Sequence, residues 1–482
     1  MATDNLAQAI KKQLGPFKSW WRLLAGPLAF LIVKYSIPPA EFSDFPLMIN
    51  ALAVAAWMIF WWVLEPIPIY VTAFLPLILG SNLGLGSLPE ISSEYGNDMV
   101  FLFLGGFMIA RAIEKFDIHK NIAARIVART GARPFGVLLG FILATAFLSM
   151  WLSNTGTAIM MLPMALSVLS PLPAGNFKNK FSTALLLAVA FSASIGGIAT
   201  LIGSPPNVMM AGILANKFDI QVDFLTWSLF GVPIAAILLF GMYFYFKKIL
   251  IKDQENFEIK VDAVRSWSKN QKRVLIVFLS TVLFWTFKKI IIDFTGIPLS
   301  DPQIALIATL FLFVIPKSES KETLLNWNDT KETPWGILFL FGGGLALAKI
   351  LSNGGVLDYF ALKIQDTGFD SFYLLLLILV VASIFLTELM SNLALVTVII
   401  PIVAEIAKSL NMDILALCLP VTVAASCAFM LPMATPPNAI IFSSQQIKVK
   451  DMARVGFILN IFAIFVIMAI VFIYDWIQTL GL

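Results

Sequence analysis

Long, mostly apolar segments recur along almost the whole chain, and short polar stretches separate them. A helix of about 20 mostly apolar residues crosses the hydrocarbon core of a bilayer, so each such segment predicts a membrane-spanning helix. We expect eleven spans, at residues 21–37, 47–64, 68–86, 98–114, 182–213, 229–246, 274–292, 302–316, 335–351, 413–442 and 455–477.

Two further apolar segments, 135–169 and 371–407, carry polar residues at their centres. They predict helical hairpins that enter the membrane and return, because irregular backbone at that depth needs protein or a water-filled cavity around it. The whole pattern predicts an all-α polytopic membrane protein with eleven transmembrane helices, two re-entrant helical hairpins and broken helices near the middle of the membrane.

Composition agrees with this fold class and narrows the chemistry. Of the 482 residues, 59% are hydrophobic and only 13% are charged, whereas soluble domains carry about twice as much charge. Two cysteines and a single histidine, His119, provide neither a disulfide framework nor a histidine-rich metal centre. Without an HExxH motif an intramembrane hydrolase is not expected. We therefore expect no enzyme activity, no resident cofactor and no nucleic-acid partner.

The distribution of charge predicts the orientation. Lysine and arginine gather before the first span, within residues 247–273 and before the last span. Basic loops stay in the cytoplasm, which places the N-terminus inside the cell and the C-terminus outside. The segment 247–273 predicts an amphipathic helix on the cytoplasmic membrane surface. The sequence thus predicts a multi-pass protein of the cell membrane, in contact with lipid.

Three motifs occur twice in the same order along the chain. The second copies follow the first by 237, 238 and 231 residues, and the charge distribution gives the two sets opposite orientations. Inverted repeats with broken helices are typical of secondary transporters, which bind their substrate near the midplane; a channel or structural scaffold does not require them. The pairs are FLFLGGFMIARAI (101–113) with LFLFGGGLALAKI (338–350), FLSMWLSNTGTA (147–158) with FLTELMSNLALV (385–396), and GSPPN (203–207) with ATPPN (434–438).

The repeats divide the chain into predicted parts. Each repeat is expected to contain one hairpin and one broken helix, with the first hairpin open to the cytoplasm and the second to the exterior. The parts are a cytoplasmic N-terminal segment (1–20), scaffold helices (21–97), the first repeat (98–214) with its hairpin (135–169), scaffold helices (215–334) with the linker (247–273), the second repeat (335–442) with its hairpin (371–407), and the last span (443–482).

A Ser-Asn pair lies in the middle of each predicted hairpin, at Ser153-Asn154 and at Ser391-Asn392. Serine and asparagine favour helix N-caps, and the free N–H groups and positive dipole of a helix N-terminus suit a carboxylate. Polar contacts between membrane helices are the alternative. Two copies at matching positions favour an anion site.

Two adjacent prolines interrupt an apolar segment in each repeat, at GSPPN and ATPPN. Proline lacks an N–H and keeps the preceding residue out of helical geometry, so each pair predicts an unwound segment with free carbonyl groups for a small cation. Hydroxyls such as those of Ser204 and Thr435 can reach a carboxylate. The alternative is an ordinary proline kink. The glycine pairs at 105–106 and 342–344 lack the ending of a phosphate loop and indicate close helix packing.

Among the ionisable residues inside predicted membrane segments, Arg111, Lys349 and Glu388 bear on the candidate site. Arg111 and Lys349 can extend to the membrane interface, or they can supply fixed positive charge near an anion site. Glu388 can pair with a neighbouring donor in a structural role, or it can take part in cation or proton coupling.

The paired motifs resemble those of the divalent anion–sodium symporter family, which contains dicarboxylate and citrate transporters. The resemblance covers nearly the whole chain and is most specific at SNT (153–155), SN (391–392), SASIGGIATLIGSPPN (192–207) and ASCAFMLPMATPPNAI (425–440). It implies a homodimer with scaffold and transport domains that works by an elevator-type movement. It also implies a C4-dicarboxylate, 2-oxoglutarate or tricarboxylate substrate.

The resemblance also implies roles for particular residues. The hairpin tips and the unwound segments line the substrate pocket, and sodium ions bind beside them largely through backbone oxygens. The implied substrate residues are Ser153, Asn154, Thr155, Ser204, Pro205, Ser391, Asn392, Thr435 and Pro436. The implied sodium sites are Ser149, Asn154 and Gly203 for the first, and Thr387, Met390, Asn392 and Ala434 for the second.

The second Ser-Asn motif departs from the family pattern, because Leu393 stands where the pattern has threonine. A lost hydroxyl and the basic residues Arg111 and Lys349 both favour sodium-independent exchange of dicarboxylates such as malate, succinate, fumarate and 2-oxoglutarate, with citrate as a further substrate. The alternative is sodium-coupled dicarboxylate symport, with Na⁺ as the coupling ion.

Overall fold

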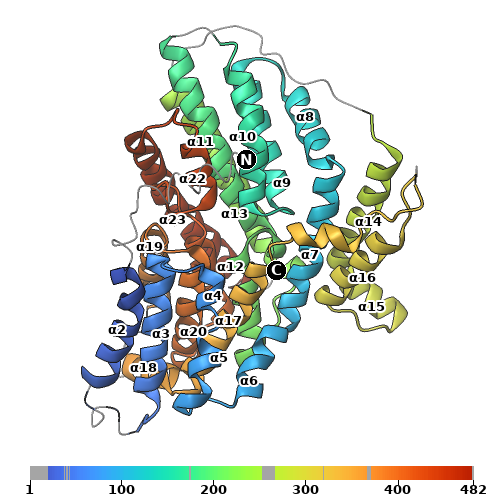
Figure 1. The fold of residues 1–482 in the computed structure, drawn as a ribbon. Coiled ribbons are helices and arrows are strands. Elements are labelled where there is room, and N and C mark those ends of the chain that lie inside the picture. Colours follow the sequence, from blue (N-terminus) through green and yellow to red (C-terminus); the bar gives the residue numbers. More distant parts are fainter. Residues whose placement is uncertain are drawn as a thin grey trace. The chain divides into compact units, whose positions relative to one another are not determined.

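The computed structural model describes residues 20–36, 38, 42, 44–172, 175–251, 266–318, 320–365 and 371–479, and Figure 1 shows its helices. The described residues form helices joined by turns, without a strand among them. The predicted all-α class is therefore confirmed. The predicted N-terminal segment (1–20), except its last residue, and much of the linker (247–273) fall outside the described residues.

The helices form two compact units, and each is described by itself. The first unit comprises the described residues within 1–97, 335–369 and 405–411. Two of its helices approach closely at Gly343, where an added Cβ atom would lie 2.3 Å from the Ala73 carbonyl oxygen, as expected of glycines that pack helices. Its helices are α2 (Trp20–Ser36), α3 (Met48–Leu64), α4 (Ile69–Thr72), α5 (Leu75–Leu79), α6 (Leu88–Ser93), α17 (Trp335–Asn353) and α18 (Val356–Gln365).

The second unit comprises the described residues within 98–334, 370–404 and 412–482 and holds both Ser-Asn motifs and both proline motifs. Its helices are α7 (Asp98–Lys115), α8 (Ile118–Thr130), α9 (Pro134–Ser149), α10 (Asn154–Leu169), α11 (Asn176–Ala199), α12 (Pro205–Phe218), α13 (Phe224–Tyr245), α14 (Lys269–Thr286), α15 (Lys288–Thr295), α16 (Asp301–Val314), α19 (Phe372–Leu386), most of α20 (Asn392–Ser409), α21 (Ile414–Ala425), α22 (Pro436–Phe442) and α23 (Val449–Thr479).

Helix α11 forms the centre of the second unit. It is almost completely buried and packs against α9, α10, α13 and α22. Small residues permit this, since an added Cβ atom on Gly196 would lie 2.3 Å from the carbonyl oxygen of Ala146 on α9. Close approach through small residues is a common way to associate helices inside a membrane. It holds the helix pair α9–α10 against α11.

Six helices of the described residues are long and apolar enough to cross a membrane, or seven if the bent pair α14–α15 is one span. A polytopic membrane protein is thus confirmed, while the predicted number of eleven spans stays a prediction. Both predicted hairpins are helix–turn–helix units, α9–α10 and α19–α20. Their re-entrant insertion and the predicted domain boundaries also stay predictions.

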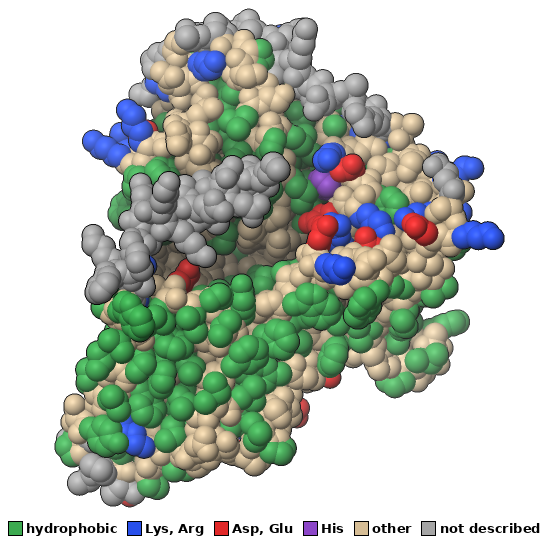
Figure 2. Space-filling model, viewed as in Figure 1, with side chains coloured by type: hydrophobic (Ala, Val, Ile, Leu, Met, Phe, Trp, Pro, Cys, Tyr) green, Lys and Arg blue, Asp and Glu red, His purple; other side chains and the backbone are tan. Residues whose placement is uncertain are grey.

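Apolar side chains cover much of the face shown in Figure 2. Large apolar side chains with high exposure include Phe294, at 91% exposed, and Phe465, at 70%. Soluble monomers rarely expose large apolar patches. This surface suits contact with lipid.

Candidate substrate and cation site

The first hairpin turns at its Ser-Asn pair. Helix α9 ends at Ser149, and α10 begins at Asn154. Ser153 has extended backbone angles and its side chain accepts a hydrogen bond from the Gly156 N–H at 3.0 Å, which is the geometry of a helix N-cap. Thr155 occupies the second position of α10. The hairpin tip therefore offers the helix N-terminus that the sequence predicts.

Several oxygen atoms converge behind this tip. Ser149 Oγ lies 2.6 Å from the Ala193 carbonyl oxygen and 2.7 Å from Asn154 Oδ1. The Asn154 oxygen is also 3.1 Å from the Ala193 carbonyl oxygen and 3.3 Å from that of Gly203. Only the hydroxyl of Ser149 carries a proton, and it can donate to one oxygen at a time. We call these four oxygen atoms the first oxygen cluster.

Two arrangements relieve the crowding in the first oxygen cluster. If the Asn154 amide turns over, its NH₂ group lies within hydrogen-bond distance of all three neighbouring oxygens and can donate its two protons to two of them. If a small cation lies among the oxygens, the amide keeps its oxygen toward the cluster. Unwound carbonyl groups and helix C-terminal ends coordinate Na⁺ in this way in other transporters. The donor set therefore fits the predicted first sodium site.

The second hairpin repeats this arrangement. Thr387, which follows α19, places its Oγ1 atom 2.6 Å from the Ala425 carbonyl oxygen and 2.8 Å from Asn392 Oδ1. Again three oxygens share one proton, and we call them the second oxygen cluster. Asn392 is the first residue of α20, directly after Ser391. No hydrogen bond of the described residues joins Met390 or Ala434 to this cluster.

Both proline motifs interrupt helices, as predicted. After α11 the chain is extended at Thr200, makes one turn at Leu201–Gly203 and is extended again at Ser204 before α12 begins at Pro205. After α21 the backbone is not helical from Ser426 until α22 begins at Pro436. Pro205 and Pro436 are each the first residue of their helix, where a missing N–H is tolerated. The hydroxyl of Thr435 caps α22 through the Asn438 N–H.

An asparagine closes each break with its side chain. Asn207 Nδ2 donates to the carbonyl oxygens of Gly197 and Thr200 at 2.8 and 2.9 Å. Asn438 Nδ2 donates to those of Ala428 and Leu431, both at 3.1 Å. Neither residue has a role that was predicted from the sequence. The sequence does mark both residues, because each is the last residue of a Pro-Pro-Asn motif.

Two buried serines were also missed. Ser194 and Ser426 directly follow Ala193 and Ala425, whose carbonyl groups belong to the two oxygen clusters. Both serines are buried, and their hydroxyls have no partner among the described residues. Buried polar groups are nearly always hydrogen-bonded. Their equivalent places in the two repeats make them candidates for contact with a bound ligand or water.

The two repeats meet inside the second unit. Helix α10 of the first repeat packs against α22 of the second, and α12 packs against α21. The ring of Phe191 on α11 lies against that of Phe429 in the second break, with centroids 5.3 Å apart. The structure thus brings the hairpins and breaks of both repeats into one region.

Arg111 and Lys349, the two basic residues considered as sources of positive charge, have acidic partners. Arg111 lies 2.6 Å from Glu332 and 3.7 Å from Glu114. In the other unit, Lys349 lies 3.4 Å from Glu90. Their charges are balanced by these carboxylates, so neither residue adds unpaired positive charge for an anion.

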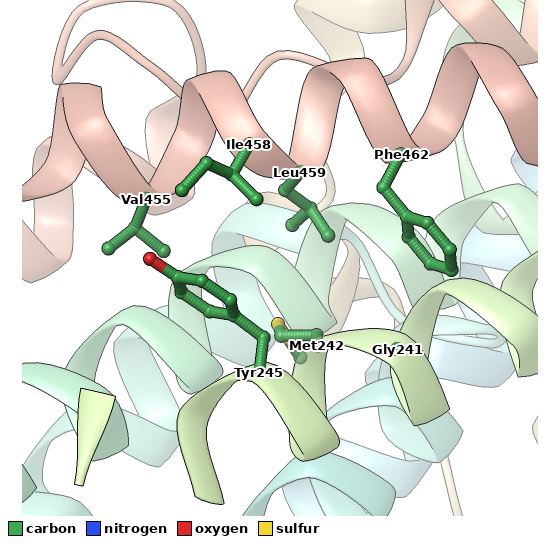
Figure 3. A pocket seen from close by; sticks show the side chains of 7 residues that line it. All are labelled: Gly241, Met242, Tyr245, Val455, Ile458, Leu459 and Phe462. Atoms are coloured by element: carbon green, nitrogen blue, oxygen red, sulfur yellow. The ribbon is translucent and has the colours of Figure 1, made fainter. Parts of the chain in front are cut away.

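A cavity of about 170 Å³ lies elsewhere, between α13 and α23. Figure 3 shows Tyr245 and Phe462 facing it from the two helices. Its other lining residues are Gly241, Met242, Val455, Ile458 and Leu459. No predicted site residue lines this apolar cavity, which therefore suits a lipid chain better than a dicarboxylate.

Comparison with known proteins decides the family. The family model described as the sodium:sulfate symporter transmembrane region matches residues 17–482. The chain belongs to the divalent anion–sodium symporter family. The resemblance found in the sequence is thereby confirmed, and members of this symporter family are membrane transporters, not enzymes.

Similar members of the symporter family come from staphylococci. The sodium-dependent dicarboxylate transporter SdcS of Staphylococcus saprophyticus is 37% identical over 470 residues, which are 93% of this chain and 90% of the relative. SdcS of Staphylococcus aureus strain USA300 is 36% identical over 473 residues, with the same coverage. The crystal structure of the YdaH transporter of Alcanivorax borkumensis has a similar fold, with a TM-score of 0.58 at 11% identity over 80% of this chain and 88% of that one.

Proposed function

We propose that this chain is a sodium-coupled transporter of C4-dicarboxylates. Two relatives that are 36–37% identical over nearly the whole chain are named sodium-dependent dicarboxylate transporters. The observation that carries the proposal is the pair of oxygen clusters, at Ser149–Asn154 and Thr387–Asn392, where more oxygens than protons converge. The two clusters give each repeat its own cation site.

Charge balance explains why a dicarboxylate needs the cations. A dianion near the midplane is costly unless positive charge accompanies it. Arg111 and Lys349 already have acidic partners, and the two hairpin tips offer only neutral hydroxyl, amide and N–H donors. Sodium ions in the two clusters would supply the missing charge. Neutral donors then hold the substrate without binding it too tightly for release.

The amide of Asn154 provides a physical link between ion and substrate. With a cation in the first oxygen cluster, its oxygen faces the ion and its NH₂ group is free to donate to a substrate carboxylate. Without the cation, the amide favours the turned orientation, in which its NH₂ group donates to two of the nearby oxygens of Ser149, Ala193 and Gly203. The oxygen then faces the pocket and repels a carboxylate. Binding of the ion thus favours binding of the substrate.

The remaining residues of the proposed substrate pocket come from the two hairpin tips and the two breaks. They are Ser153, Thr155, Ser204, Pro205, Ser391, Asn392, Thr435 and Pro436. The proposal includes the sodium ligands Gly203, Met390 and Ala434, an elevator-type movement, a homodimer and a cytoplasmic N-terminus. Malate, succinate and fumarate are the expected substrates, with 2-oxoglutarate and citrate as further candidates.

Sodium-independent exchange, which the sequence favoured, has weaker support than sodium coupling. One of the two reasons for exchange was the positive charge of Arg111 and Lys349, and both residues have acidic partners. The other was Leu393, whose side chain is buried. Exchange remains the second candidate on the strength of that missing hydroxyl.

Uptake of labelled succinate into proteoliposomes distinguishes sodium-coupled transport from sodium-independent exchange. The vesicles are prepared empty or loaded with unlabelled succinate, each with and without an inward sodium gradient. We expect accumulation in empty vesicles that depends on the sodium gradient. Uptake that requires internal succinate and ignores sodium would instead establish exchange. Vesicles with protein reconstituted after heat denaturation serve as the control.

A further inference from the structure

Glu388 is a buried carboxylate that the proposed site does not use. Its residue is 4% exposed, and it directly follows Thr387 of the second oxygen cluster. No lysine or arginine of the described residues lies within ion-pair distance of its carboxylate. A buried charge without a cation is costly unless several donors surround it.

Backbone N–H groups of the second break surround this carboxylate. Glu388 Oε1 accepts hydrogen bonds from the N–H groups of Phe429 and Met430, both at 2.8 Å, and Oε2 accepts one from Leu431 at 3.0 Å. Three successive N–H groups that point at one anion form the concave arrangement known as a nest. Asn460 of α23 adds a fourth donor, with its Nδ2 atom 2.8 Å from Oε1.

All four partners of Glu388 are donors. An ionised carboxylate only accepts hydrogen bonds, whereas a protonated one must also donate. The two carboxylate oxygens therefore serve as acceptors for all four donors. This favours the structural alternative for Glu388 over a role in proton coupling.

In the first repeat, the position equivalent to Glu388 has no carboxylate that could bind the broken helix. The position that corresponds to Glu388 is Met150, three residues before Ser153 as Glu388 is before Ser391. There the hydroxyl of Thr200 donates to the main-chain oxygen of Met150, and α11 continues in helical form to Ala199. In the second repeat the helix ends at Ala425, so residues 429–431 have no helical acceptors for their N–H groups. The carboxylate of Glu388 supplies acceptors for these N–H groups instead.

The side chain of Glu388 thus connects two parts of the second half of the site. It belongs to the turn that leads to Ser391 and Asn392, and it binds the unwound segment 426–435 that leads to Thr435. We propose that Glu388 is a positioning residue that replaces missing main-chain acceptors and holds the unwound segment 426–435 against the second hairpin tip. This inference rests on the proposed function for its effect on transport, but its structural part can be tested without transport.

The chain contains its own reporter of this segment. Cys427 lies within the unwound segment 426–435 and is fully buried. The only other cysteine, Cys418, can be removed by Cys418→Ala. The rate at which N-ethylmaleimide labels Cys427 in purified protein then measures how often the segment opens.

Glu388→Gln is the decisive variant, because it keeps the shape of the side chain but places an NH₂ group opposite an N–H donor. We expect Cys427 to be labelled roughly tenfold faster, as for the loss of a hydrogen bond to a charged group. Asn460→Leu removes one donor but leaves the nest intact, so it should give a smaller increase. Glu405→Gln, the same change at another buried carboxylate, should leave the labelling rate at the value of the Cys418→Ala parent.

Uptake kinetics separate positioning from general stability. We expect Glu388→Gln to raise the succinate concentration for half-maximal uptake several-fold more than it lowers the maximal rate, and Glu388→Asp to restore part of the loss. Unchanged Cys427 labelling in a folded Glu388→Gln protein would overturn the inference, as would an equal increase in Glu405→Gln. If Glu388→Gln does not fold, the Asn460→Leu labelling rate decides, and a rate equal to that of the parent overturns the inference. Failure of wild-type sodium-driven uptake would reject the proposed function alone.

Discussion

Asn154 lies directly over Gly197, so that an added Cβ atom on this glycine would be 2.4 Å from Asn154 Oδ1. The glycine belongs to the last turns of α11, and the asparagine begins α10. Only a residue without a side chain lets the hairpin tip reach the broken helix. The geometry of the first oxygen cluster therefore depends on Gly197, although this glycine contributes no oxygen atom to the cluster.

Gly197→Ala should displace the Asn154 amide and weaken both ion and substrate binding. We expect sodium-driven succinate uptake to fall at least tenfold, because overpacking at a close contact costs about 1–3 kcal/mol. Gly96→Ala is the matched control, since an added Cβ atom there has nothing within 4 Å. Near-normal uptake by Gly197→Ala would show that the hairpin tip tolerates this shift.

Asn154→Ala and Asn392→Ala should each abolish uptake while the protein stays folded. Each removes the amide that belongs both to an oxygen cluster and to a hairpin tip. Elution from a size-exclusion column and thermal unfolding check the fold, and the proteoliposome assay checks function. Normal transport by either variant would remove the hairpin-tip assignment.

Asn207→Ala and Asn438→Ala should lower stability and transport together. Each asparagine donates to two carbonyl oxygens of its break, and leaving buried acceptors unpaired costs about 1–3 kcal/mol. We expect the midpoint of thermal unfolding to fall in both variants. An unchanged midpoint would mean that other groups hold the breaks.

Lowering the pH should destabilise the protein through His119. Burial lowers the pKa of this side chain in the folded protein, and its Nε2 atom has no partner among the described residues. The unfolded chain therefore takes up the proton first, so the neutral folded form loses stability as the pH falls through the ordinary histidine range near 6.5. Thermal unfolding between pH 8 and pH 5 measures this loss, which His119→Gln should reduce. An identical pH profile in the variant would contradict the assignment.

Leu393→Thr tests whether the missing hydroxyl affects coupling. The residue follows Asn392 at the start of α20. If the hydroxyl strengthens substrate or ion contact, the variant should reach half-maximal uptake at a lower sodium concentration. The same sodium dependence as wild type would make the departure from the family pattern incidental.

The sequence predicts the positions of the interruptions but not their shapes. The Ser-Asn pairs indicate the turns between α9 and α10 and between α19 and α20, because their capping preference is local. The predicted spans 182–213 and 413–442 each correspond to two helices with a break. The second break is longer, and Pro432 explains part of this because proline disfavours helical geometry at the residue before it.

Interactions between distant segments are beyond local patterns. The bonds of Asn207 and Asn438 across their breaks, and those of Glu388 to residues 429–431, depend on how the helices pack. Sequence reasoning left two roles open for Glu388 and could not choose between them. The sequence also leaves two roles open for Arg111 and Lys349, extension to the membrane interface or fixed positive charge near an anion, because their acidic partners Glu332 and Glu90 lie far away in the sequence or on other helices.

The asparagine bonds that close both breaks have a further consequence for ligand binding. Because the walls of the proposed pocket are held by the protein itself, a ligand need not order them, and little backbone entropy is lost on binding. Differences in affinity among dicarboxylates of equal length would then reflect the freedom that each ligand loses. The rigid double bond of fumarate would give it an entropic advantage over succinate, which has to give up rotation about its central bond.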